Sequence, residues 1–107
     1  MAFYIKQNDT SPALQATLKD SNDTAIDLSS ASVRFHMRKV GAVTPKIDGN
    51  ATISNADGGV VYYQWQTGDT DTIGSYEGEF EVTFVGGEIE SFPNNRYIQI
   101  EITNAIA

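Results

Sequence analysis

Apolar and polar residues alternate along most of this chain, and a period of two predicts β-strands rather than helices. The alternation is clearest over residues 14–19, 33–38, 76–84 and 97–103. Residues 60–63 are apolar on both sides, which is typical of a strand buried on both faces. Weaker strand candidates cover residues 3–5, 25–28, 51–54 and 88–92. The strongest helical candidate, residues 27–32, is long enough for one turn at most.

Turn-forming residues separate these segments, and their spacing indicates the class of fold. The clusters are DSND at 20–23, NADGG at 55–59, VGGE at 85–88 and PNN at 93–95. Short strands that recur every ten residues or so, with such turns between them, predict an all-β sandwich or barrel. A chain of 107 residues is the size of one domain, so we expect a single domain over residues 1–107.

One motif favours a sandwich over a barrel. The stretch DTIGSYEG at 71–78 resembles the tyrosine corner of immunoglobulin-like domains, in which a Tyr hydroxyl bonds the backbone a few residues upstream. Tyr76 would be that residue, with an ordinary core aromatic as the alternative. We therefore predict an immunoglobulin-like antiparallel β-sandwich of about seven to nine strands.

The inward face of each predicted strand supplies the expected core. Its members are Leu14, Leu18, Val33, Phe35, Met37, Val61, Tyr76, Phe80, Val82, Ile98 and Ile100. Trp65 ends a strand and is therefore the first candidate for partial exposure among the aromatic residues, although burial in the core is the expected outcome. An exposed aromatic cluster around Trp65 would bind carbohydrate by stacking, whereas a buried cluster would only be core.

Three carboxylates, Glu77, Glu79 and Glu81, alternate along one predicted strand and lie about 6.5–7 Å apart. That separation suits a pair of glycosidase acids, but a catalytic acid also needs burial in a cleft. Carboxylates in a row on a sheet face are more typical of its solvated side, so we expect no enzyme. Arg34, His36 and Arg38 form a complementary basic row. We predict that these two strands are neighbours, with the opposite charges facing each other.

Charge and composition exclude several other functions. The net charge is −7, and residues 47–95 contain nine acidic residues and no Lys or Arg, so neither nucleic acid nor an anionic membrane is an expected partner. The absence of Cys excludes disulfides and thiolate metal sites, and a single His excludes a multi-histidine site. Asp69 and Asp71 are expected to form a polar turn, with a calcium loop as the alternative. We expect no cofactor, no signal peptide and no span of a bilayer.

The first residues contain an apolar segment, Phe3, Tyr4 and Ile5. At a chain terminus these residues must either add a strand to their own sheet or pair with a neighbouring molecule. Together with Trp65, they are the expected interaction surface.

Four pieces of the sequence, taken in order, resemble a family of phage proteins. They are SPAL-x-ATL-x-D, DLSSASVRFHMR, W-x-T-x-D-T-x-x-x-G-x-Y-x-x-E-F and FPNN-x-Y. Their joint order is similar to the N-terminal domain of the baseplate upper protein of tailed bacteriophages, an immunoglobulin-like sandwich. This resemblance covers most of residues 8–103.

The resemblance implies a non-enzymatic docking subunit of the virion tail or baseplate, made in the host cytoplasm. Its expected partners are other virion proteins, and further copies of itself are an option. A capsid decoration or head–tail protein and a carbohydrate-binding module are the alternatives. Because the sequence ends at Ala107, we expect either one domain of a larger protein or a subunit that acts alone.

Overall fold

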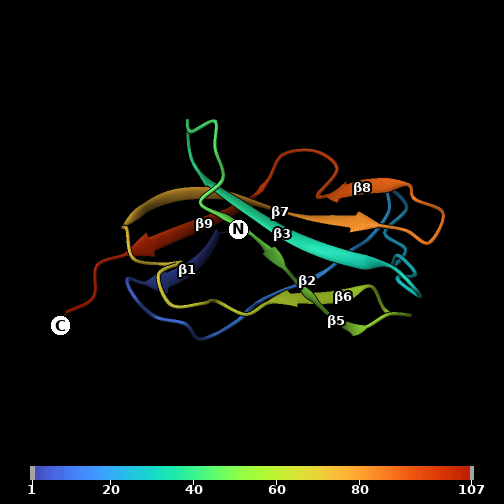
Figure 1. The fold of residues 1–107 in the computed structure, drawn as a ribbon, viewed down its shortest axis with the longest axis horizontal. Helices are drawn as coiled ribbons and strands as arrows, with labels where there is room; N and C mark the ends of the chain where they lie inside the picture. The colour runs from blue at the N-terminus through green and yellow to red at the C-terminus, as the bar shows by residue number, and fades with distance from the viewer. Residues whose placement is uncertain (1, 107) are drawn as a thin grey trace.

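A computed structural model describes residues 2–106, which form nine β-strands and no helix (Figure 1). The strands are β1 (Ala2–Lys6), β2 (Leu14–Thr17), β3 (Ser32–Lys39), β4 (Ile47–Asn50), β5 (Thr52–Asn55), β6 (Val60–Tyr63), β7 (Gly74–Thr83), β8 (Ile89–Phe92) and β9 (Ile98–Thr103). The predicted all-β class and strand number are confirmed.

The strands form two sheets that enclose the core (Figure 1). The larger sheet has the order β1-β9-β7-β3-β4, and β8 pairs with the far half of β7, beyond the end of β9. The smaller sheet has the order β2-β6-β5. All pairs are antiparallel except β1 and β9, which run parallel, so the antiparallel prediction is wrong at this edge. The chain leaves β1 for the opposite sheet, so no tight hairpin forces an antiparallel neighbour on it.

The predicted core is confirmed for every member except Ile98, which is half-buried. Phe35 and Phe80 are fully buried, with ring centroids 5.2 Å apart, on the adjacent strands β3 and β7. The rings of Phe35 and Tyr63 stack at 4.6 Å and so join the two sheets. Gly78 leaves room for this packing, because an added Cβ would lie 2.8 Å from Ile100 Cδ1.

Two local predictions differ from the structure. Residues 25–28 form only an isolated bridge between Ala25 and Lys19, not a strand. Residues 27–32 contain no helical turn: residues 29–30 form a turn, and Ser32 already begins β3. Conversely, the sequence IDGN of β4 carries little strand signal, with Gly and Asn among four residues. It becomes a strand because it pairs with β3 and buries Ile47.

The tyrosine corner is present at the start of β7. Tyr76 is buried, and its hydroxyl donates a hydrogen bond of 2.7 Å to the carbonyl oxygen of Thr72, four residues upstream. This is the bond that the motif predicts. The two sheets confirm the sandwich architecture, while its assignment to the immunoglobulin-like class stays a prediction.

Replacing Tyr76 with Phe should lower the free energy of unfolding by about 1–2 kcal/mol, because the hydrogen bond from the Tyr76 hydroxyl to the Thr72 carbonyl is lost. Urea unfolding measures the change. Tyr4→Phe is the matched control, since the Tyr4 side chain is 67% exposed and should unfold like the unmodified protein. Equal stability of the two variants would contradict a structural role for the corner.

Candidate functional site

Charged side chains cover the outer face of the larger sheet, where β3 lies next to β7. The register places Arg34 opposite Glu81, His36 opposite Glu79 and Arg38 opposite Glu77. The predicted pairing of the basic row with the acidic row is therefore confirmed as a strand register.

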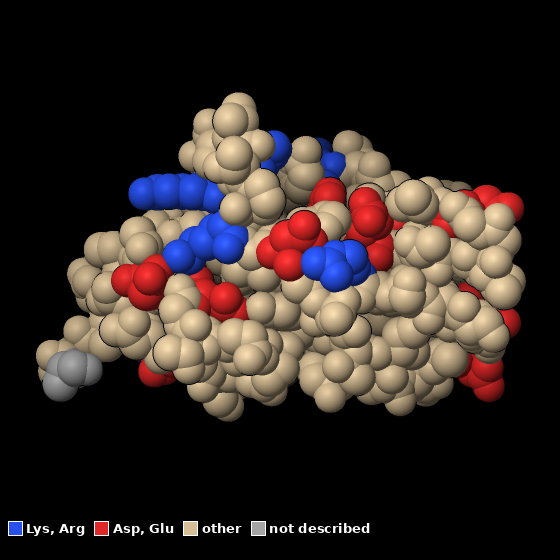
Figure 2. Space-filling model, viewed as in Figure 1, with Lys and Arg blue, Asp and Glu red and all other residues tan. Residues whose placement is uncertain are grey.

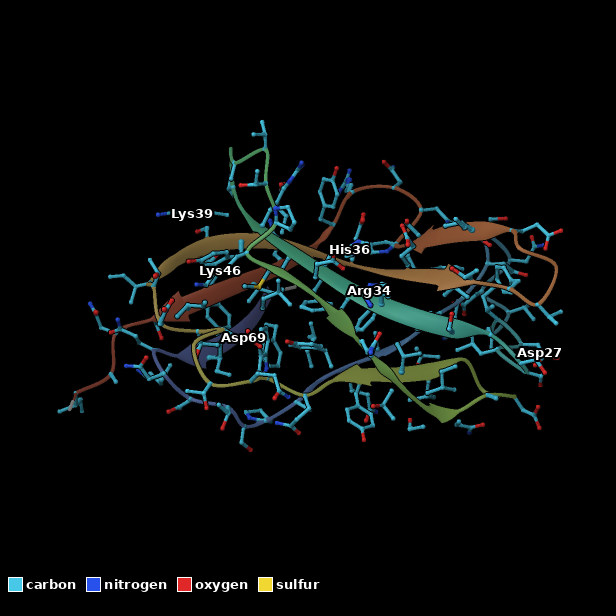
Figure 3. The ribbon with its side chains drawn as sticks, viewed as in Figure 1. Asp27, Arg34, His36, Lys39, Lys46 and Asp69 are labelled. Atoms are coloured by element: carbon cyan, nitrogen blue, oxygen red, sulfur yellow. The ribbon has the colours of Figure 1, made fainter. Side chains whose placement is uncertain are left out.

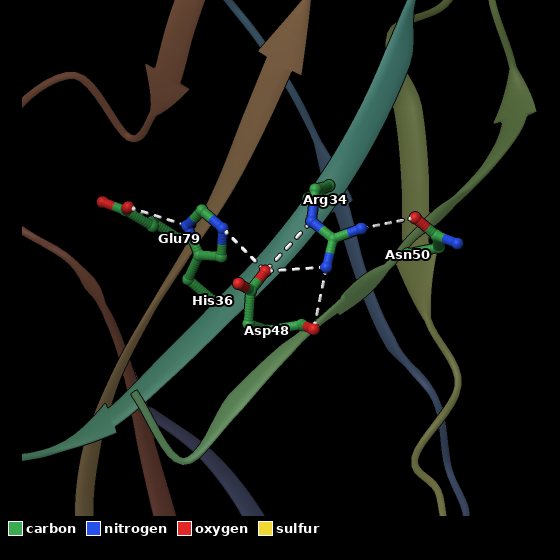
Figure 4. Close-up of polar contacts among 5 residues, drawn as sticks. All are labelled: Arg34, His36, Asp48, Asn50 and Glu79. Carbon is green, nitrogen blue, oxygen red and sulfur yellow. Dashed lines mark hydrogen bonds and ion pairs between the residues drawn. The ribbon is translucent and has the colours of Figure 1, made fainter. Parts of the chain in front are cut away.

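Two of the three opposed pairs are in contact, and the third is not. Arg38 Nε lies 3.1 Å from Glu77 Oε1, and His36 Nδ1 lies 3.2 Å from Glu79 Oε2. Arg34 turns away from Glu81 toward β4, where its guanidinium lies 2.8 Å from Asp48 Oδ1. It also donates to Asn50 Oδ1 and to the Asp48 carbonyl, both at 2.8 Å (Figure 4). Several bonds from one planar guanidinium favour the β4 side over a single bond to Glu81.

His36 lies between two carboxylates on its two neighbouring strands. Its Nδ1 faces Glu79, and its Nε2 lies 3.2 Å from Asp48 Oδ1 (Figure 4). An imidazole ring donates from both nitrogens only when both carry a proton. This geometry therefore suits the charged ring, which connects β4, β3 and β7 across the face.

Asp48 is expected to make the free energy of unfolding of the protein depend on pH. Hydrogen bonds from Arg34 lower the pKa of Asp48 below its ordinary value of 3.8, and the charges of Arg34 and His36 act in the same direction. A carboxyl whose folded-state pKa is depressed stabilises the fold above its unfolded-state pKa, and this contribution is lost as the pH falls through the folded-state value.

We therefore expect the urea midpoint of the unmodified protein to fall as the pH drops from about 5 to below the ordinary Asp pKa. Asp48→Asn should show a smaller fall over that range, because it removes one of the carboxylates that must be protonated. An Asp57→Asn control should keep the full fall. Equal pH dependence of Asp48→Asn and the unmodified protein would contradict this role.

A hollow of about 340 Å³ opens on this face beside the hairpin that joins β3 to β4. Residues 40–46 of that hairpin project from the body of the molecule (Figure 1). Val43 is 94% exposed and lines the hollow with Pro45 and Tyr97, which follows β8. The guanidinium of Arg38 lies 5.0 Å from the centroid of the Tyr97 ring. The remaining lining residues are His36, Met37, Arg38, Asp48, Glu77 and Glu79.

The space-filling view shows the projection as a mass of uncharged atoms, with basic and acidic side chains around its base (Figure 2). Lys39 and Lys46 lie at the two ends of the hairpin (Figure 3). Lys46 Nζ is held 2.7 Å from Asp71 Oδ1, which fixes one of these two positive charges. The lining of the hollow therefore combines apolar side chains with charged ones.

The predicted interaction residues do not form one surface. Trp65 is only 2% exposed, so it belongs to the core, as expected, and offers no surface to a partner. The reason is β1, which adds to the home sheet beside β9 and stacks Phe3 on Trp65 at 5.9 Å. Ile5 is also buried, and Phe3 is partly buried, whereas Tyr4 is 67% exposed on the edge strand. Trp65 Nε1 lacks a hydrogen-bond partner among the described residues.

The polar turn at 66–72 behaves as predicted for Asp69. Its carboxylate accepts bonds from the backbone amide of Gln66 at 2.8 Å and from the Tyr63 hydroxyl at 2.6 Å. Burial and the Asp69 carboxylate both raise the pKa of Tyr63. Asp71 instead pairs with Lys46. Within residues 2–106, no group of three or more His, Cys, Asp or Glu side chains is placed to hold a metal ion.

Sequence reasoning missed Val43, and it considered Tyr97 only as one of several aromatic residues rather than as part of this face. Val43 carries a readable signal, since it is an apolar residue in a short turn between two strands, with Gly41 and Pro45 nearby. Nothing along the chain connects it with Tyr97, which lies more than fifty residues later.

A scan against protein-family models and a search of curated proteins both find no match for this chain. Over the described part of the chain, no helix is long and apolar enough to cross a membrane.

Proposed function

We propose that this protein is a non-enzymatic docking subunit of a tailed-phage virion, most simply a tail or baseplate component that binds neighbouring virion proteins. The docking part rests on the projecting hairpin, where Val43 is 94% exposed beside Tyr97 and the charged hollow. Exposed apolar groups bordered by polar residues are typical of protein interaction sites. The virion part rests on the sequence resemblance, and the two-sheet fold is compatible with it.

The geometry favours docking over the two rival classes. Glu77 and Glu79 line the hollow and are held by Arg38 and His36 at 3.1 and 3.2 Å, which supports a role in positioning charges on this face. The carbohydrate-binding alternative relied on exposed aromatic residues around Trp65, which is buried. Tyr4 and Tyr97 are the tyrosines that remain most exposed, and they lie at different places on the larger sheet.

Quantitative mass spectrometry of purified particles of the source phage tests the proposal. A copy number far below that of the major capsid protein would support a tail or baseplate position. Copies that rival the capsid protein would instead support the capsid-decoration alternative. Absence from particles would overturn the virion assignment.

A second test concerns the hairpin. Val43→Glu should reduce incorporation into particles severalfold, because a charge replaces an apolar contact group in the proposed interface. Val85→Glu is the matched control, since Val85 is 83% exposed in the turn between β7 and β8, away from the hollow. Equal incorporation of both variants would place the docking surface elsewhere.

A further inference from the structure

The hollow beside the hairpin has an excess of negative charge. Its lining contains three carboxylates, Asp48, Glu77 and Glu79, against the guanidinium of Arg38 and the imidazole of His36. Arg38 is already engaged by Glu77 at 3.1 Å and by the ring of Tyr97. The nearby Arg34 is engaged by Asp48.

Glu79 and Glu81 are the two carboxylates of this strand that have no Lys or Arg partner among the described residues. Glu79 contacts His36, and neither glutamate forms an ion pair with a Lys or Arg of residues 2–106. This follows from the rotation of Arg34 toward β4, which leaves Glu81 without the partner that the strand register places opposite it. The Glu79 side chain is 29% exposed, so its charge is accessible from the hollow.

The lining of the hollow indicates more about a partner than that it carries a positive charge. Val43, Pro45 and the ring of Tyr97 add apolar surface to the same lining as the carboxylates. Lys and Arg side chains match this combination, because their methylene stems pack against apolar groups while their charged ends reach carboxylates. The Tyr97 ring, on which the Arg38 guanidinium already lies, adds apolar area for such a stem. A volume of about 340 Å³ lies at the small end of ligand pockets and leaves room for a long side chain.

We infer that this hollow receives a Lys or Arg side chain from the protein on which the subunit docks. The inference rests on the proposed docking function and adds the chemistry of the partner: a basic residue on a surface that also covers Val43. The net charge of −7 agrees with a basic partner surface, since it attracts that surface before contact.

The test is a titration of isotope-labelled protein with the peptide acetyl-Gly-Arg-Gly-amide, followed by amide chemical shifts. The shifts should saturate and be confined to residues that line the hollow, such as His36, Glu79 and Tyr97. Glu79→Gln should weaken the affinity by about fivefold, because it removes the charge but keeps an oxygen that accepts from His36. Glu88→Gln is the matched control for charge, and it lies in the turn between β7 and β8.

Three results would overturn the inference. One is equal weakening by Glu79→Gln and Glu88→Gln with scattered shifts, which would mean non-specific attraction to an acidic protein. Another is equal binding of acetyl-Gly-Gln-Gly-amide or acetyl-Gly-Glu-Gly-amide, which would remove the requirement for a cation. The third is the absence of any saturating shift with the Arg peptide.

A comparison of Val43→Ser with Val85→Ser in the same titration tests the apolar wall. We expect weaker binding only for Val43→Ser, and equal affinities would remove the wall from the proposed site. The outcome is separable from that of the particle experiment. If Val43→Glu is poorly incorporated into particles but the unmodified protein does not bind the Arg peptide, docking through the hairpin is supported. The inference that the partner inserts a basic side chain is then rejected. If the protein binds the Arg peptide but is absent from particles, the hollow does accept a basic side chain and the virion assignment is rejected.

Discussion

Replacing Phe80 with Ala is expected to lower the free energy of unfolding by about 3–5 kcal/mol, the range for deleting a large aromatic from a core. Phe80 is fully buried in the middle of β7, where β3 flanks it on one side and β8 on the other. Its ring packs against Phe35 at 5.2 Å, so truncation leaves a cavity between two strands that cannot close without bending the sheet.

Thermal unfolding measures this change directly. For a domain of this size, such a loss lowers the melting temperature by about 12 °C or more. Val85→Ala is the control, because its side chain is 83% exposed and its truncation removes few contacts. A melting temperature of Phe80→Ala close to that of the control would contradict the inward orientation of this face of β7.

The second large effect is expected at Gly59, in the turn before β6. Its φ of +67° is a conformation that residues with a Cβ rarely adopt, and an added Cβ would lie 2.7 Å from the Leu18 carbonyl oxygen and 3.0 Å from that of Ile26. These are backbone atoms, and the chain is pinned there because the Leu18 amide donates to the Gly59 carbonyl at 2.7 Å. Neither side can move away without losing that bond.

Gly59→Ala should therefore lower the free energy of unfolding by about 2–4 kcal/mol, the sum of backbone strain and steric overlap. Gly87→Ala separates the two causes in a urea titration. Gly87 has a φ of +92°, but no neighbouring atom lies within 4 Å of its Cβ position. We expect a loss of about 1 kcal/mol there, from strain alone. Equal losses at both glycines would show that the contact with residues 18 and 26 does not matter.

The strand segments and their inward faces were predictable, because alternation is written into short stretches of chain. Residues 33–38 and 76–82 point their apolar side chains inward and their charges outward, as the alternation predicts. The pairing of β3 with β7 was also predictable, since opposite charges at matching intervals favour one register. β4 was not predictable, because Gly and Asn hide its strand character until β3 supplies a partner.

The burial of Trp65 by the N-terminal strand could not be predicted from the residues around Trp65. Trp65 ends a strand pattern, and such a residue is exposed unless another segment covers it. Here β1 covers it, through Phe3, from more than sixty residues away. Three apolar residues near a terminus predict a strand, but they do not show whether that strand joins a sheet of its own chain or a sheet of another molecule.

The sequence by itself determined the class of fold, the two faces of the main strands and the tyrosine corner. Each of these depends on residues within about ten positions of one another, where strand and turn geometry fixes the relation between side chains. Only the tertiary structure decided that Val43, Glu79 and Tyr97 border one hollow, and that Arg34 serves Asp48 rather than Glu81. Those relations depend on which distant strands become neighbours, and that choice follows from the free energy of the whole packed sandwich rather than from any one segment.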